Sequence, residues 1–350
     1  MTERGSRRSA CSKQAIAAAT SPASLRVEPR LLQAASDTWR IIAGLGHDEL
    51  SRQVRADRID ILVDLAGHTA RIRLPMFAQR PAPVQATWAG YVGTTGMAAI
   101  GYLISDERET PAGTDPFYVE TVLRLPDGYV CYAPPDYAPA VAPLPAGRRG
   151  SVTFGCFNNL AKVGPAVLAL WGRIMSALPD ARLMLKTHAL GDPDTAERYR
   201  ALARAAGIAP RQIVLQGASP HRELLAAYGE IDIALDPFPY SGGLTTLESL
   251  WMGVPVVTLG GDGFAARHSL SHLTTLGLPA LAAAGPDGYV DIAIGLARDL
   301  PRLARLREEL RARMASSPLC DGPRFTGHLE AAYRVMWQHW CQRKLATSTT

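Results

Sequence analysis

The fold of this chain is decided by the stretch Asp236-Pro-Phe-Pro-Tyr-Ser-Gly-Gly-Leu-Thr-Thr-Leu-Glu-Ser-Leu-Trp-Met-Gly-Val-Pro-Val-Val-Thr258. Its pattern predicts the end of a buried strand (231–235), a glycine loop, a helix over 245–252, a tight turn and a second strand over 256–259. The turn is expected because Gly253 suits the C-terminal end of a helix and Pro255 cannot continue one. A strand, a helix and a strand in close succession are typical of a parallel sheet.

The loop within this stretch has the features of an anion site. Gly242 and Gly243 allow the backbone to bend and to approach a ligand closely. Thr245 and Glu248 have the spacing of a capping box, which predicts that the helix begins beside the loop. Backbone N–H groups at a helix start lie at the positive end of the helix dipole, so a diphosphate could bind there. An ordinary capped strand–helix unit explains the same residues equally well.

A second loop carries a lysine in a similar setting. Residues 152–157 are predicted to form a buried strand, Asn158-Asn-Leu-Ala-Lys162 follows it, and Pro165 suits the first turn of a helix over 165–178. This loop therefore lies at the carboxyl end of a strand, where open α/β sheets bind their ligands. The chain has only four lysines among its 37 basic residues, and a compact ammonium suits contact with a diphosphate oxygen. The alternative is a solvated loop lysine.

Strands and helices alternate over the second half of the chain, which indicates a doubly wound parallel sheet. The further strands are predicted over 182–186 and 212–215, and the further helices over 195–206, 220–228, 265–276, 287–299 and 302–313. The first half supplies five strand candidates, at 41–45, 59–65, 84–88, 102–105 and 122–125. Between the halves, residues 133–145 contain five prolines and are expected to form a semi-rigid linker.

Composition limits the classes of function. The chain has 350 residues, of which 47% are hydrophobic and 20% charged, as is ordinary for a soluble globular protein with two domains. No apolar run approaches the roughly 20 residues of a membrane helix, so no membrane partner is expected. The net charge is +5, but residues 1–30 supply most of it. We therefore expect no nucleic-acid partner, and a disordered basic tail over 1–30.

The cysteines and histidines show no pattern of a metal site. The five cysteines have neither metal-ligand nor redox spacing, and the eight histidines do not cluster with them. Buried thiols in a reducing compartment are the simplest interpretation, which predicts a cytoplasmic location. We therefore expect neither a metal nor another cofactor.

Five motifs occur in order between roughly residues 37 and 341. They are Ile61-Leu-Val-Asp-Leu-Ala-Gly-His-Thr69, residues 80–96, Phe157-Asn-Asn-Leu-Ala-Lys162, the stretch from Asp236 to Pro255, and Ser317-Pro-Leu319 with an aromatic helix over 333–340. Together they resemble the catalytic region of the O-linked N-acetylglucosamine transferases, in a bacterial type without helical repeats. The resemblance implies an α/β protein of the GT-B fold, with two Rossmann-like lobes that contain parallel sheets.

The resemblance also implies a role for each matching residue. It implies that Lys162 holds the diphosphate and stabilises the charge that builds as the nucleotide leaves. The other donor-binding residues that it implies are Asn159, Ser219, His221, Tyr240, Gly242, Gly243, Leu244, Thr245, Thr246 and Glu248. From the other lobe, the sugar and acceptor side would be formed by Ala89, Gly90 and Tyr91. His68 is our candidate for the general base, and a structural histidine that bonds the loop backbone is the alternative.

The implied activity is inverting, metal-independent transfer of N-acetylglucosamine from UDP-GlcNAc, a nucleotide-sugar, to Ser/Thr hydroxyls of a protein or peptide acceptor. Gly243 and His221 stand where the animal enzymes have a histidine and a lysine, so GDP-fucose and UDP-glucose stay open as donors. The family's Asp-Phe-x-x-His motif does not occur before Ile61, and we expect a truncated first lobe. A non-catalytic nucleotide-sugar-binding protein is therefore an alternative, as is an epimerase or small-molecule glycosyltransferase of this fold.

The expected organisation has five segments. The disordered tail (1–30) precedes a partial N-terminal Rossmann-like lobe (31–132) on the acceptor side. A proline-rich linker (133–150) leads to a C-terminal Rossmann-like lobe (151–322) that binds the nucleotide-sugar. A last helix (323–344) is expected to pack back on the first lobe.

Overall fold

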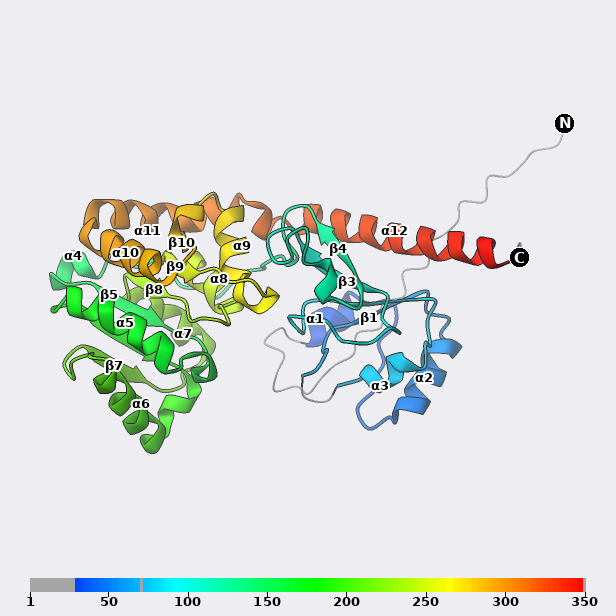
Figure 1. The fold of residues 1–350 in the computed structure, drawn as a ribbon, viewed down its shortest axis with the longest axis horizontal. Coiled ribbons are helices and arrows are strands. Elements are labelled where there is room, and N and C mark those ends of the chain that lie inside the picture. The colour runs from blue at the N-terminus through cyan, green and yellow to red at the C-terminus, as the bar shows by residue number, and fades with distance from the viewer. Residues whose placement is uncertain (1–28, 70–71, 349–350) are drawn as a thin grey trace. The chain divides into compact units, whose positions relative to one another are not determined.

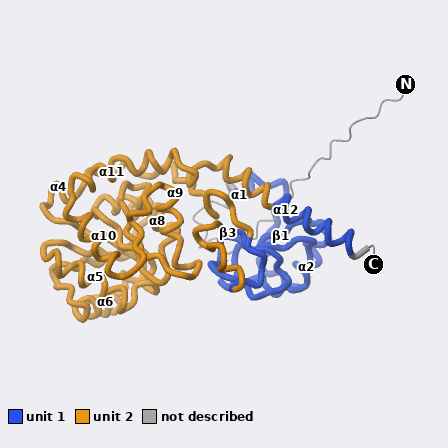
Figure 2. The backbone as a smooth tube through the Cα atoms, turned by 45° about the horizontal axis from the view of Figure 1, so that its top comes forward, with its two compact units in different colours: residues 1–104, 117–122, 333–350 blue, residues 105–116, 123–332 orange. Residues whose placement is uncertain are grey.

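The computed structural model describes residues 29–69 and 72–348 (Figure 1). The chain divides into two compact units (Figure 2): unit 1 comprises residues 1–104, 117–122 and 333–350, and unit 2 comprises residues 105–116 and 123–332. The expected disordered tail lies outside the described residues up to position 28, and helix α1 (Pro29–Ala34) follows it. Among the described residues, no helix has both the length and the apolar character needed to cross a membrane.

Unit 2 is built on a six-stranded sheet in which every pairing is parallel. The strand order is β10-β9-β8-β5-β6-β7. The strands are β5 (Thr153–Cys156), β6 (Arg182–Lys186), β7 (Ile213–Gln216), β8 (Ile233–Leu235), β9 (Val256–Leu259) and β10 (Ala282–Ala283). The chain runs outward from β5 to β7 on one side and then from β8 to β10 on the other. The order therefore reverses between β5 and β8, which is where open α/β sheets form a ligand crevice.

Helices cover both faces of this sheet (Figure 1). Successive strand residues point to opposite faces, so Leu183 and Leu185 of β6 join one buried cluster and Met184 joins another. The first cluster includes residues of α5 (Pro165–Ala177), α6 (Pro193–Ala205) and α10 (Pro286–Arg298), and the second includes residues of α7 (His221–Ala227). The other helices of the unit are α4 (Ala146–Arg149), α8 (Leu244–Trp251), α9 (His268–Thr275) and α11 (Leu300–Ala315).

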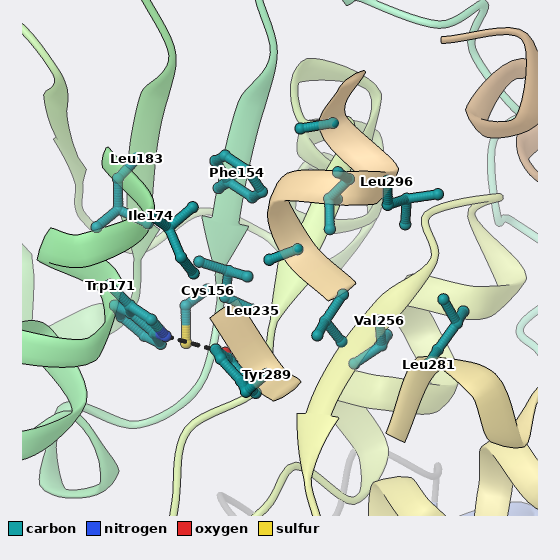
Figure 3. Packing of buried hydrophobic residues seen from close by; sticks show 14 of the residues in the cluster. Phe154, Cys156, Trp171, Ile174, Leu183, Leu235, Val256, Leu281, Tyr289 and Leu296 are labelled. Carbon is teal, nitrogen blue, oxygen red and sulfur yellow. Dashed lines mark hydrogen bonds between the residues drawn. The ribbon is translucent and has the colours of Figure 1, made fainter. Parts of the chain in front are cut away.

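Two large side chains of the first cluster are joined by a hydrogen bond (Figure 3). Trp171 of α5 and Tyr289 of α10 are both fully buried, and the Trp171 Nε1–H donates to the Tyr289 hydroxyl at 2.9 Å. That hydroxyl donates in turn to the backbone carbonyl of Asp236 at 3.0 Å. Because each buried polar group has a partner, the pair connects two helices to the end of β8 without a desolvation penalty.

A second, four-stranded sheet has the order β1-β2-β3-β4. Its strands are β1 (Ile61–Asp64), β2 (Val84–Thr87), β3 (Tyr102–Asp106) and β4 (Thr121–Leu125), and β2 pairs in parallel with both β1 and β3. Unit 1 also contains α2 (His47–Ala56) and α3 (Leu74–Ala78). The long helix α12 (Gly322–Ser348) groups with unit 1 from Tyr333 onward, where the His339 Nδ1 lies 3.4 Å from the Tyr102 hydroxyl.

The predicted strands and helices of unit 2 all occur, with ends displaced by up to three residues. In unit 1 the predicted strand over 41–45 is wrong. Gly44 has φ +91° there and the Leu45 N–H donates to the Ile42 carbonyl at 3.2 Å, so the segment forms a turn. Ile42 is buried while Ile41 is 79% exposed, so this apolar run fills one core position without pairing in a sheet. The aromatic stretch 333–340 lies within α12 (Gly322–Ser348), whose ends are within four residues of the predicted last helix over 323–344.

Candidate active site

Two loops leave unit 2 at the carboxyl ends of adjacent strands. Residues 157–162 follow β5 and end in a 3-10 turn (Leu160–Lys162), and residues 236–243 follow β8 and lead into α8. Since β5 and β8 are paired in parallel, both loops lie at the same edge of the sheet. The structure thus brings the predicted lysine loop and the predicted glycine loop together.

Lys162 lies directly against the glycine loop. Its Nζ donates to the backbone carbonyl of Ser241 at 2.8 Å and sits 3.7 Å from the centre of the Tyr240 ring. An ammonium over an aromatic face is attracted by the negative face of the ring. Burial lowers the pKa of Lys162, and the nearby Asp236 carboxylate opposes that shift. The side chain is therefore held as a localised positive charge beside residues 240–242.

The two asparagines of the lysine loop have different surroundings. Asn158 is buried, and its Oδ1 accepts from the Thr245 hydroxyl at 2.9 Å, so it joins this loop to the start of α8. Asn159 is exposed, and its Oδ1 accepts from the Ala161 N–H at 3.0 Å, which caps the turn that ends at Lys162. Asn159 therefore shapes the backbone that presents Lys162.

A buried carboxylate holds the glycine loop in place. Asp236 is 2% exposed and accepts from the Gly242 N–H and from the Thr258 hydroxyl, both at 2.7 Å. Burial raises the pKa of Asp236 to about 6, although these hydrogen bonds lower it. A Cβ on Gly242 would lie 2.7 Å from the Thr245 and Thr246 hydroxyl oxygens and 3.0 Å from an Asp236 oxygen. The loop therefore requires glycine at 242 for lack of space.

The predicted capping box at the start of α8 is wrong. The helix begins at Leu244 with Gly243 as N-cap, and no side chain caps it. Thr245 lies inside the first turn and bonds Asn158, while the buried Thr246 hydroxyl donates to the Gly242 carbonyl at 3.0 Å. A Cβ at Gly243 would meet nothing within 4 Å, and Leu244 is 46% exposed, so the helix start opens outward. Its first N–H groups have no partner within the helix and can serve an anion.

Glu248, instead of capping, pairs with His221. Its Oε1 lies 2.8 Å from the His221 Nε2, and the carboxylate is 1% exposed. On the other side of the ring, the His221 Nδ1 lies 2.8 Å from the Tyr137 hydroxyl. The Ser219 Oγ, two residues before His221, is buried and has no hydrogen-bond partner among the described residues. The structure thus brings together His221 and Glu248, two of the donor-binding residues that the resemblance implies.

The predicted residues of the first sheet form a separate group in unit 1. The His68 Nε2 lies 2.8 Å from the Thr95 carbonyl and must donate to it, and the ring meets Tyr91 edge-on at 5.1 Å. Ala89 has φ +61°, a left-handed conformation that is rare outside glycine. A Cβ on Gly90 would overlap the Leu65 carbonyl, so this turn also requires glycine. The bond to Thr95 matches the structural alternative for His68, and its role as a base stays a prediction.

Sequence reasoning missed four residues that the structure places at or beside these loops. Asp236 was assigned only to a strand end, and Asn158 only to the lysine loop. Tyr137 lies in the proline-rich linker, and His268 opens a helix with no local motif. The spacing from Asp236 to Gly242 was the one usable signal, because an aspartate often bonds the backbone of the loop that follows it.

The chain matches a known protein family over most of its length. Residues 44–132 and 144–329 match glycosyl transferase family 41. The chain is 45% identical over 304 residues to a protein of Petunia hybrida named probable UDP-N-acetylglucosamine–peptide N-acetylglucosaminyltransferase SPINDLY, covering 87% of this chain and 33% of that protein. It is 30% identical over 323 residues to the Arabidopsis thaliana protein of the same class named SEC, covering 89% and 32%. The chain thus spans about a third of the length of these relatives.

Solved structures agree as well. The structure of a mutant O-GlcNAc transferase from Thermobaculum terrenum superposes with a TM-score of 0.84 at 46% identity, covering 89% of this chain and 59% of that one. Anabaena HepE, solved with UDP and glucose, shares only 12% identity at a TM-score of 0.55, covers 87% and 88%, and so supports the fold alone. The fold class is that of the GT-B glycosyltransferases. The chain belongs to glycosyl transferase family 41.

Proposed function

We propose that this protein is a glycosyltransferase that moves N-acetylglucosamine from UDP-GlcNAc to Ser/Thr hydroxyls of a protein or peptide. The observation that carries the proposal is the position of Lys162, whose Nζ lies 2.8 Å from the Ser241 carbonyl beside the open start of α8. The diphosphate would bind where this ammonium and the helix N-terminus meet. Membership of family 41 and the names of the relatives support the choice of sugar and acceptor.

The proposed reaction is a single displacement with inversion. The acceptor oxygen attacks the anomeric carbon, the bond from that carbon to the diphosphate oxygen breaks, and UDP leaves with the electron pair. The acceptor proton passes to a base, for which His68 is our candidate. Its Nε2–H is occupied by the Thr95 carbonyl, so Nδ1 is the nitrogen that would accept the proton.

The leaving diphosphate gains negative charge as the bond breaks. We propose that Lys162 and the N–H groups at the start of α8 stabilise this charge without a metal ion. Such preorganised donors commonly contribute about 10²–10³-fold each to turnover. Turnover is then expected to persist in excess EDTA.

The His221–Glu248 pair is proposed to bind the ribose and the base. Glu248 is an acceptor held at the floor of the site by His221, and a ribose hydroxyl is a donor that would suit it. The described part of the chain offers the buried Ser219 hydroxyl no hydrogen-bond partner, and a polar atom of the nucleotide would satisfy it. Glu248→Gln should therefore weaken donor binding about 10- to 150-fold with little change in kcat, since a hydrogen bond to a charged group contributes about 1.5–3 kcal/mol.

The test uses the purified full chain and radiolabelled UDP-GlcNAc, UDP-glucose and GDP-fucose, each with a library of Ser- and Thr-containing peptides. Peptide labelling from UDP-GlcNAc that survives EDTA and is lost in Lys162→Met supports the proposal. Peptide labelling from only UDP-glucose or only GDP-fucose would show that the protein is a glycosyltransferase that transfers a different sugar. Donor binding by calorimetry, without transfer or hydrolysis of any donor, would establish the non-catalytic alternative.

A further inference from the structure

A buried cluster of three side chains lies at the first residue of α9, beside Tyr240. The cluster contains Glu109, Tyr129 and His268, which are 1%, 5% and 2% exposed. The His268 Nδ1 lies 3.0 Å from the Glu109 Oε1 and 3.2 Å from the Tyr129 hydroxyl. The Tyr129 and His268 rings also stack, with centres 5.8 Å apart and planes 22° from parallel. All three residues belong to unit 2.

Asp106, at the end of β3, fixes the backbone that carries this cluster. Its carboxylate accepts from the N–H groups of Arg108 and Glu109, both at 2.8 Å, and from the Tyr129 N–H at 2.9 Å. It also accepts from the Ser271 hydroxyl of α9 at 3.1 Å. These four hydrogen bonds fix the backbone at Glu109 and Tyr129 and tie it to α9, the helix that carries His268.

The His268 ring also lies close to the glycine loop. Its centre lies 6.2 Å from that of the Tyr240 ring, and Tyr240 in turn carries the Lys162 Nζ at 3.7 Å. The next residue, Ser269, donates to the Gly242 carbonyl at 3.1 Å. The first turn of α9 thus contacts both the aromatic ring under the ammonium and the glycine loop beside it.

We propose that His268 is a positioning residue that, held by Glu109 and Tyr129, keeps the Tyr240 ring under Lys162 and so keeps the ammonium at the glycine loop. The inference rests on the proposed function, because it assigns a support to the same site. His268 acts through Tyr240 and Lys162 rather than on the substrate.

The protonation of the cluster fits this task. Burial raises the pKa of Glu109 well above its usual range and lowers that of His268 to about 4. Protonated Glu109 can thus donate its O–H to the single lone pair of Nδ1, while the Tyr129 ring stacks on the imidazole. The imidazole stays neutral with its proton on Nε2. A neutral ring beside Tyr240 avoids repulsion with the Lys162 ammonium, which is itself one cause of the lowered pKa of His268.

The test reads the ionisation of Lys162 directly. The chain has four lysines, so reductive methylation with ¹³C-formaldehyde gives few NMR signals, and Lys162→Arg identifies the signal of Lys162. His268→Leu should raise the pKa of Lys162, because the ring that shields its ammonium from water is no longer held. The matched control is His272→Leu, which removes another buried histidine of the same helix and should leave that pKa unchanged.

Turnover gives a second measurement. His268→Leu should lower kcat about 10- to 100-fold while the Kd for UDP-GlcNAc changes less than about threefold, since a small misplacement of a catalytic group acts mainly on the reacting step. Glu109→Leu should cause a similar loss, and Glu109→Gln should restore most of it, because the amide can still donate to Nδ1. This comparison also holds if His268→Leu fails to fold.

An unchanged pKa of Lys162 in His268→Leu, or equal effects of Glu109→Leu and Glu109→Gln, would overturn the inference. The NMR measurement needs no substrate. If the chain transfers no sugar at all, the proposed function fails, while the link from His268 to Lys162 is still decided by the pKa of Lys162.

Discussion

In each of the two sheets of this protein, a buried aspartate at the carboxyl end of one strand fixes the loop that follows that strand. In the first sheet, Asp64 at the end of β1 accepts from the Gly67 N–H at 2.8 Å and from the hydroxyl of Thr87, on the neighbouring strand β2, at 3.1 Å. In the second sheet, Asp236 follows β8 and accepts from the Gly242 N–H and from the Thr258 hydroxyl of the neighbouring β9. Each carboxylate is at most 3% exposed.

The two loops differ in the residues that lie next to them. Lys162 lies against the loop at Asp236, and the adjoining helix start opens outward. The loop after Asp64 carries His68, whose Nε2 is occupied by the Thr95 carbonyl. The comparison teaches that an aspartate–glycine–threonine arrangement builds a rigid loop but does not by itself make an anion site. A cation from the next strand along the sheet makes the difference.

The strongest test removes that cation. Lys162→Met should lower kcat about 10²–10³-fold, because one preorganised donor to the leaving diphosphate is lost. Steady-state kinetics with UDP-GlcNAc measure the loss, and Lys344→Met on the exposed end of α12 is the matched control. If turnover were unchanged in Lys162→Met, the lysine would not be what makes the loop after Asp236 differ in function from the loop after Asp64.

Replacing the buried aspartate of each sheet tests whether the two carboxylates stabilise their loops in the same way. Asp64→Asn and Asp236→Asn should each lower the free energy of unfolding by about 1–3 kcal/mol, since each weakens buried hydrogen bonds to a charged acceptor. Urea denaturation followed by circular dichroism measures both. Only Asp236→Asn should also weaken donor binding in calorimetry. If Asp64→Asn weakened donor binding as much, the two loops would not differ in function.

The pH dependence of stability tests the carboxylate of the second sheet, Asp236. Burial raises the pKa of Asp236 from 3.8 to about 6, so the folded protein holds this proton more tightly than the unfolded chain. The resulting stabilisation is complete below about pH 4 and is lost as the pH rises through about 6. The stability of the wild type relative to Asp236→Asn should therefore fall between pH 4 and pH 6. If the difference in the free energy of unfolding between the wild type and Asp236→Asn did not change over that range, the raised pKa of Asp236 would be contradicted.

The smallest expected effect concerns the threonines. Thr87→Val and Thr258→Val each remove one hydroxyl donor to the buried aspartate and keep the side-chain shape. Each should lower the free energy of unfolding by about 0.5–1.5 kcal/mol, the usual contribution of one hydrogen bond. Thermal denaturation of the two variants side by side measures this. A large loss of stability in only one of the two variants would show that the threonine contributes differently in the two sheets.

Much of the second sheet could be predicted from the sequence. Its strands are short apolar runs bounded by glycine, proline and helix signals, and these local patterns located every strand from β5 to β9. The first sheet was harder, because the apolar run 41–45 has strand-like composition. The left-handed Gly44 turns the chain there, and a single-sequence pattern does not reveal which apolar residues will find a pairing strand.

The site was predicted in part, for a similar reason. Lys162 and Gly242 stand out locally, as a rare lysine in a loop and a glycine pair before a helix. The predicted helix cap was wrong because the N-cap is Gly243, two residues before the Thr245 of the capping-box motif. Glu248 then turns to His221, 27 residues away, and no local spacing predicts that pairing.

The order of residues by itself determined the alternation of strands and helices, the glycine bend at 242 and the lysine at 162, because hydrophobic period, backbone freedom and charge belong to short segments. Only the tertiary structure decided that Lys162 meets Ser241, that Asp236 holds Gly242, and that Glu109 meets His268 across 159 positions. Those contacts depend on which strands become neighbours, and parallel pairing joins segments that are far apart in the chain.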